Sequence, residues 1–171
     1  MALIVEDGTG KSDANAYCSQ AFADAWHLAR GITLWASMTG AEKDAALVRA
    51  THFLVQRYRL RWRGVRRLEA QALDWPRYQV PRVDVDYGDV SSEVVPIEVQ
   101  QACAELAFKA AAGDLAPDEG QTVKRKKVDA IEVEYAEGSS PTKRYVAIDR
   151  LLAPYLLGGS GGGSMIPVLR A

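Results

Sequence analysis

A dense group of arginines with aromatic neighbours is the feature of the sequence that most suggests chemistry. Six arginines fall within eleven residues, interleaved with Tyr58 and Trp62. These arginines are Arg57, Arg59, Arg61, Arg63, Arg66 and Arg67. Arginine and aromatic side chains bind the phosphates and bases of nucleic acids, and both are enriched at protein–protein interfaces. The segment therefore predicts an interaction surface, and at this point either kind of partner fits.

Charge favours a protein partner. The net charge is -1 and the pI is near 6.1, so the domain as a whole is not marked as a binder of polyanions. An acidic group, which includes Asp84, Asp86 and Glu93, follows the arginines along the chain. A basic and an acidic patch on one small chain indicate head-to-tail association, which closes into a ring when the rotation allows. We therefore predict a subunit interface between the six arginines and these three acidic residues. The alternatives are a nucleic-acid surface and a face that is solvated or paired within the chain.

The stretch Gly10-Lys11-Ser12 looks like the end of a phosphate-binding loop, in which backbone amides and a lysine hold phosphates. The spacing of that motif needs a glycine five positions before Gly10, and Val5 stands there. No later strand supplies an aspartate for magnesium, and the chain lacks the strand–helix alternation of a parallel sheet. A polar turn that leads toward a helix is the expectation, with a nucleotide-hydrolysing enzyme built on Lys11 as the minor alternative.

Few other residues could do chemistry. Cys18 and Cys103 lie far apart without metal-ligand spacing, and this favours two reduced, buried thiols. His27 and His52 each fall on a helical pattern with no ligand cluster beside them. We therefore expect no catalytic residue, no cofactor and no metal site. No apolar run approaches the roughly 20 residues that span a bilayer, so no membrane partner is expected.

The C-terminal sequence combines a linker with an apolar peptide. Residues 158–164 are glycine and serine only, which is the composition of a flexible coil with a root-mean-square span of roughly 15 Å. The peptide that follows is Met165, Ile166, Pro167, Val168, Leu169 and Arg170. Too short to fold alone, it is predicted to dock on a partner. A frayed terminus without a partner is the alternative, and an engineered origin of the linker stays open.

Periodicity and capping signals place the elements. Ser19 predicts the start of a helix to about Arg30, and Thr39 with Glu42 forms a capping box before a helix over about 41–59. Pro96 suits the first turn of a third helix, which ends at Gly113. Alternating residues predict a β-hairpin near 122–136 that turns near 129–130, and a short helix follows over about 147–152.

These elements predict a mainly α protein. We expect a small helical bundle of three main helices and a short C-terminal helix, with a β-hairpin and a flexible C-terminal tail. The domain prediction is one helical domain over residues 1–157, followed by the linker and docking peptide over 158–171.

With these elements in place, the sequence resembles head–tail connector or adaptor proteins of tailed phages, a family sometimes labelled DnaT-like single-stranded-DNA-binding. The Gln71-Ala72-Leu73-Asp74-Trp75-Pro76-Arg77 element is the most distinctive part of the likeness. The other matching stretches are Ile4–Gly10, Asp13–Tyr17, Ala45–Tyr58 and Lys127–Tyr135, together with the glycine-rich tail.

The resemblance implies a structural virion protein that forms a ring, by analogy a dodecamer, below the portal and around the DNA channel. Its expected partners are the portal protein, the next tail component and further copies of itself, with DNA only passing through. Residues 165–170 would dock on the portal, and the protein would reside at the capsid–tail junction after assembly in the host cytoplasm. The DnaT-like label implies instead a single-stranded-DNA-binding replication protein, in which Tyr58 and Trp62 would act as stacking platforms.

Overall fold

The fold is built around one long helix whose start is set by its sequence. In the computed structural model, which describes residues 2–83, 87–116, 125–128, 131–134 and 143–158, helix α3 spans Gly40–Tyr58. The Thr39 side chain accepts from the backbone N–H of Glu42, and the Glu42 carboxylate accepts from the backbone N–H of Thr39. This reciprocal pair satisfies two N–H groups that a helix start would otherwise leave unbonded, so the predicted capping box is confirmed.

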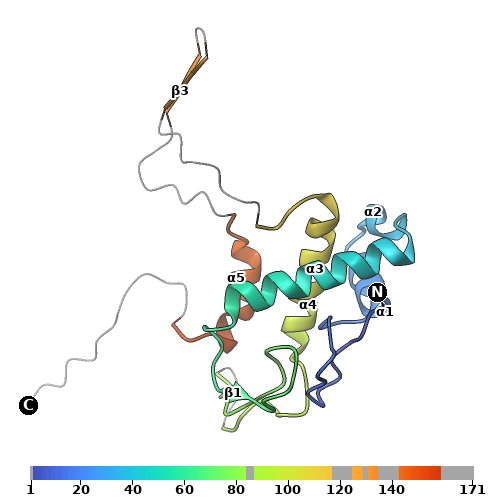
Figure 1. Cartoon of the computed structure of the whole chain (residues 1–171), viewed down its shortest axis with the longest axis vertical. Coiled ribbons are helices and arrows are strands. Elements are labelled where there is room, and N and C mark those ends of the chain that lie inside the picture. The colour runs from blue at the N-terminus through green and yellow to red at the C-terminus, as the bar shows by residue number, and fades with distance from the viewer. Residues whose placement is uncertain (1, 84–86, 117–124, 129–130, 135–142, 159–171) are drawn as a thin grey trace, which may run out of the picture.

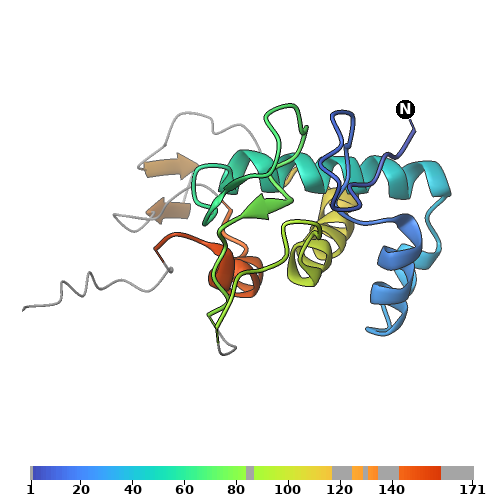
Figure 2. The same ribbon diagram turned by 90° about the horizontal axis from the view of Figure 1, so that it is seen from below.

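Three further helices pack on α3. Helix α1 (Gln20–Leu28) is capped by Ser19, helix α4 (Ile97–Ala112) starts after Pro96, and helix α5 (Val146–Leu152) continues into the 3-10 turn η1 (Ala153–Tyr155). Figure 1 shows α4 crossing α3, with α1 near one end of α3 and α5 near the other. In Figure 2 these three helices lie on one side of α3.

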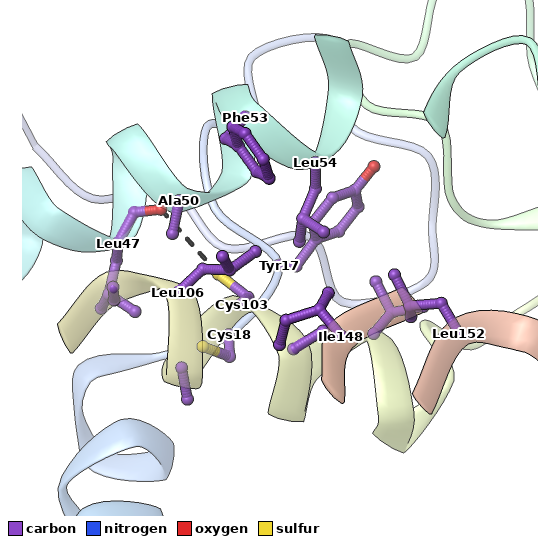
Figure 3. Packing of buried hydrophobic residues seen from close by; sticks show 14 of the residues in the cluster. Tyr17, Cys18, Leu47, Ala50, Phe53, Leu54, Cys103, Leu106, Ile148 and Leu152 are labelled. Carbon is purple, nitrogen blue, oxygen red and sulfur yellow. Dashed lines mark hydrogen bonds between the residues drawn. The ribbon is translucent and has the colours of Figure 1, made fainter. Parts of the chain in front are cut away.

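The core is the space between α3, α4 and the segments that cross them. α4 carries small side chains that are fully buried, including Ala102, Cys103 and Ala107, and Cys103 contacts Thr51 of α3. Figure 3 shows this packing, with Leu47, Ala50 and Leu54 of α3 facing α4 and with Ile148 and Leu152 approaching from α5. Small residues on one helix and larger ones on its neighbour allow the two backbones to approach closely.

The predicted fold class is confirmed: the described part of the chain is mainly helical, with the main helices α1, α3 and α4 and the short helix α5 near the C-terminus. The predicted hairpin is also present, since β3 (Arg125–Val128) pairs antiparallel with β4 (Ile131–Glu134). Helix α2 (Thr33–Ala36), the two short strands β1 (Val65–Arg66) and β2 (Arg77–Tyr78), and the turn η1 were not predicted. The tail beyond Gly158 lies outside the described residues.

Candidate functional site

The arginine-rich segment leaves α3 and folds back on itself. Strand β1 pairs antiparallel with β2, with Val65 opposite Tyr78 and Arg66 opposite Arg77. Gly64 lies at the turn into β1 with φ +66, and a Cβ there would stand 2.0 Å from the carbonyl oxygen of Tyr78. Only glycine fits so close to another backbone. The segment from Arg59 to Arg77 is therefore closed on itself by the pairing of β1 with β2, and it is found at the label β1 in Figure 1.

The distinctive Gln71–Arg77 element holds this loop together. The buried Gln71 side chain donates to the carbonyl oxygens of Leu73 (2.8 Å) and Pro76 (3.1 Å), and it accepts from the N–H of Leu68 (2.8 Å). Buried amides must find such partners, because an unpaired one costs about 1–3 kcal/mol. Gln71 thus serves the structure, and the distinctive element is a folding motif.

Arg77 completes the loop from its other end. Its guanidinium donates to the carbonyl oxygens of Arg63 (2.8 Å), Gly64 (2.7 Å) and Asp74 (3.1 Å), and the residue is buried. Burial lowers the pKa of Arg77, while the nearby Asp74 opposes that change. The planar guanidinium has several N–H donors and can bond to three carbonyl oxygens at once. The single ammonium of a lysine would reach all three poorly.

Most of the six predicted interface arginines are engaged inside the chain. Arg57 bonds to Asp149 of α5 (3.2 Å), Arg63 donates through Nε to the carbonyl of Leu156 (3.0 Å), and Arg66 donates to the carbonyls of Glu69 and Gln71. Arg67 donates to the carbonyls of Gly8 (2.8 Å) and Ser92 (3.2 Å). The alternative that the arginines are paired within the chain therefore holds for these four side chains. Each of them uses one or more of its N–H donors in such a contact.

The remaining two arginines are more available. Arg59 is half exposed and lies 3.7 Å from the Asp74 carboxylate, which is a loose ion pair. Within the described part of the chain, the guanidinium of Arg61 makes a cation–π contact with Tyr58 at 5.4 Å and no ion pair. Leu60 stands between them and is 93% exposed. This short stretch, Arg59–Arg61, is the basic tip of α3.

The carboxylates near the basic tip are buried. Asp74 bonds to the indole N–H of Trp62 (3.2 Å), and Asp149 accepts from the Tyr58 hydroxyl (2.7 Å). Burial raises the pKa of Asp74, and the Arg59 guanidinium opposes that rise. Since both acids are buried, whereas Arg59 is exposed and Arg61 is half-buried, the accessible charge of these four residues is positive.

The predicted stacking platforms are wrong. Tyr58 is 0% exposed and Trp62 is 2% exposed, and their rings contact each other at 5.7 Å. Trp62 also meets Trp75 edge to face. Burial and the Asp149 contact raise the pKa of Tyr58 to about 12. The helical period explains the error, because Tyr58 follows Leu54 and Ala50 on the face of α3 that packs inward.

The predicted acidic partners are placed only in part. Asp84 and Asp86 lie outside the described residues, as does the docking peptide 165–170. Glu93 is described, and its carboxylate lies 3.1 Å from the Arg67 guanidinium of the same chain. The pairing of these acids with a neighbouring subunit stays a prediction.

The glycine–lysine–serine turn holds an internal anion. The buried Glu6 carboxylate accepts from the backbone N–H groups of Gly8 (2.9 Å), Gly10 (2.9 Å) and Lys11 (2.8 Å). The ammonium of Lys11 bonds to the Val5 carbonyl and to Asp7. The donors that a phosphate would need are thus used by Glu6, in agreement with the predicted polar turn.

The histidines and cysteines are structural where they are described. His27 is buried, and its Nε2 lies 3.0 Å from the carbonyl oxygen of Ala104, whereas His52 is exposed. Cys18 and Cys103 are buried free thiols, as expected. Within the described residues, no group of histidine, cysteine and acidic side chains could hold a metal ion.

Comparison with known proteins adds one decisive observation. A family model described as "Putative DnaT-like ssDNA binding protein" matches residues 1–171. The chain belongs to this family. No curated protein and no solved structure matches it. Of the two descriptions in the sequence resemblance, membership in the DnaT-like family supports single-stranded-DNA binding, and the head–tail adaptor gains no support from it.

The geometry limits the side-chain groups through which a member of the DnaT-like family could contact DNA. With Tyr58 and Trp62 in the core, the basic tip offers guanidinium groups and one exposed leucine. Guanidinium groups bind phosphates whatever the DNA sequence is.

The described residues contain no helix long and apolar enough to cross a membrane.

Proposed function

We propose that this DnaT-like family member binds single-stranded DNA, without catalysing a reaction, through the basic tip of α3. The family match supplies the ligand class. The single observation that carries the site is that Arg59 is exposed and Arg61 is half-buried, while the nearby acids Asp74 and Asp149 are buried. Guanidinium groups that are more accessible than the acids beside them attract a phosphate backbone.

The binding mode is phosphate contact with little base stacking. Exposed aromatics supply about 1–3 kcal/mol per base in sequence-tolerant DNA binders, and the aromatics of this segment are buried. Affinity should therefore come mainly from charge, be modest, and fall steeply with salt. The overall net charge of -1 acts in the same direction, because repulsion from the rest of the surface weakens binding.

A titration of labelled oligo-dT at several salt concentrations tests the site. Replacing both arginines, as R59Q with R61Q, should reduce the slope of log K against log salt by about 1.4, because two phosphate contacts are lost. The matched control is R49Q, which removes an exposed arginine from the middle of the same helix. If oligo-dT does not bind at low salt, the proposed function is wrong. If it binds and the double variant binds equally well, only the site is wrong.

A second function, head–tail adaptor, is favoured by a different observation. Arg57, Arg63, Arg66 and Arg67 use donors on contacts inside the chain, so fewer of their N–H groups are left to bind the phosphates of DNA near this surface. A subunit that surrounds passing DNA needs such weak attraction, since the DNA must slide. In this proposal the protein is a virion component that forms a ring below the portal and joins it to the next tail component. The tip and the acidic group would meet between subunits, and residues 165–170 would bind the portal.

Truncation separates the two proposals. Removing residues 158–171 should abolish attachment to portal-bearing capsids if the chain is an adaptor, and it should leave oligo-dT binding unchanged if the basic tip is a DNA site. Thermal unfolding of the truncated chain checks that its fold is intact. Normal capsid attachment without the tail would remove the docking role of residues 165–170.

A further inference from the structure

A hollow lies beside the start of α3, at the end of that helix opposite the basic tip. It has a volume of about 260 Å³, and side chains of α1, α2 and the start of α3 line it. Its apolar lining comes from Leu28, Ile32, Ala36 and the ring of Trp35, and Leu28 is 80% exposed at its edge. Pockets for small molecules measure about 300–1,000 Å³, so this α1–α2 hollow suits a few side chains of a peptide better.

The α1–α2 hollow also contains a hydrogen-bond acceptor that is left free. The ammonium of Lys43 (2.9 Å) and the indole N–H of Trp35 (2.7 Å) both donate to Oδ1 of Asp24. Among the described residues, the other carboxylate oxygen of Asp24, Oδ2, has no hydrogen-bond partner, and this side chain is 42% exposed. A guanidinium forms short, charge-assisted hydrogen bonds with such an oxygen. The hollow therefore fits apolar side chains that are followed by an arginine.

The C-terminal peptide of this chain has that composition. Ile166, Pro167, Val168 and Leu169 are apolar and stand directly before Arg170. The ring of Pro167 fixes one backbone angle, so the peptide loses less conformational entropy when it binds. The sequence thus supplies both the apolar side chains and the cation that the hollow fits.

The length of the chain indicates which copy supplies the peptide. The described chain ends at Gly158, next to the bond between Leu157 and Arg61 just after α3. Figure 1 shows α1 and α2 at the other end of α3, a helix of 19 residues that is about 28 Å long. The chain from Gly158 to Met165 measures at most about 25 Å when fully extended, and its composition predicts an average span of roughly 15 Å. Even the extended linker is shorter than α3, so the hollow of a second copy is the better match.

We propose that the C-terminal peptide of one copy docks in the α1–α2 hollow of a second copy and joins the two head to tail. Apolar side chains such as that of Leu169 enter the hollow beside Leu28 and Trp35, and Arg170 donates to Oδ2 of Asp24. Each copy carries one peptide and one hollow, which is a heterologous interface that closes into a ring or continues as a filament. The link does not depend on DNA binding.

Sedimentation velocity of the full-length protein over a wide range of concentration tests this link. Self-association should rise with concentration, and L28D should weaken it by roughly 10–100-fold, because a buried leucine contact is lost. L34D is the matched control, since Leu34 is 69% exposed on α2 and does not line the hollow. The double tail variant, I166D with L169D, should weaken association as L28D does, and thermal unfolding checks that each variant is folded.

A mixture of the two defective variants gives the sharpest result. The L28D chain keeps its peptide and the double tail variant keeps its hollow, so together they should form a one-to-one complex although each alone stays monomeric. Wild-type protein that is monomeric at every concentration would overturn the proposal. A tail variant that associates like the wild type, an L28D chain that does so, or a mixture that stays monomeric would also overturn it.

Discussion

The backbone N–H of Leu157 donates to the carbonyl oxygen of Arg61 at 2.6 Å. Arg63 donates to the carbonyl of Tyr155 at 2.8 Å in the same antiparallel arrangement, and Trp62 forms a bridge with Leu156. The last described residues are thus fixed to the arginine segment. The described part of the chain therefore ends beside the basic tip of α3.

Replacing Leu157 by proline should loosen this attachment. L157P removes the donor of the bond to Arg61 and should lower the free energy of unfolding by about 1–2 kcal/mol. Urea denaturation measures the change, and amide exchange at Arg63 should become faster. L157A is the control, because the Leu157 side chain is 58% exposed and its loss should matter little. Equal stability of the two variants would show that the backbone bond contributes nothing.

Replacing Glu6 should destabilise the N-terminal turn. E6A leaves three backbone N–H groups without their acceptor, and we expect a loss of roughly 2–4 kcal/mol in the free energy of unfolding. D13N, a change at an exposed acid of the same turn, should leave the denaturation midpoint unchanged. Should E6A unfold at the wild-type urea concentration, the turn does not depend on the carboxylate.

Arg77 should not tolerate lysine. R77K keeps the charge, but one ammonium cannot reach the carbonyls of Arg63, Gly64 and Asp74 together, so we expect a loss of roughly 2–4 kcal/mol. Chemical denaturation measures the loss, and R82K, at an exposed arginine, is the matched control. Near-identical unfolding curves for R77K and R82K would argue against Arg77 as the anchor of the loop.

His27 should make the protein sensitive to mild acid. Burial, together with the charge of Arg30, lowers the pKa of His27 below 6.5, while the Ala104 carbonyl and the charges of Asp24 and Glu105 oppose that change. The unfolded chain then takes up a proton that the folded protein resists. The contribution of His27 to the free energy of unfolding is therefore complete above pH 6.5. It is lost as the pH falls below that value, by at most about 1.4 kcal/mol per pH unit.

The pH dependence of urea unfolding for H27Q tests this assignment. Glutamine keeps a donor for the Ala104 carbonyl and removes the titration, so the curve between pH 6.5 and pH 5 should flatten. H52Q changes the exposed histidine and should leave the curve as in the wild type. Parallel curves for H27Q and the wild type would assign the acid sensitivity to another group.

The sequence predicted the helices because their signals are local. The Ser19 cap, the Thr39–Glu42 box and Gly113 each act within one or two turns of their helix. Helix α2 was missed because a single turn has no period to detect. Strands β1 and β2 were missed because two-residue strands leave no alternation, and their pairing depends on the distant contacts of Arg77 and Gln71.

The candidate site was harder to predict than the fold. Composition revealed the arginines but not their partners, since Asp149 and Leu156 lie about ninety residues farther along the chain. Only the single-stranded-DNA alternative required Tyr58 and Trp62 to be exposed, because their arginine neighbours suggested a shared surface. The spacing of Tyr58 from Ala50 and Leu54 predicted instead that Tyr58 faces the core, and this prediction is confirmed.

The turn around Glu6 also bears on how such motifs are recognised. An acid carried on the same chain sits at an effective concentration that free nucleotide does not reach, so it excludes the ligand that the motif normally binds. A search for glycine–lysine–serine loops could use this directly. An acidic residue a few positions before the lysine, able to reach into the loop, would identify from the sequence alone a loop that does not bind nucleotide.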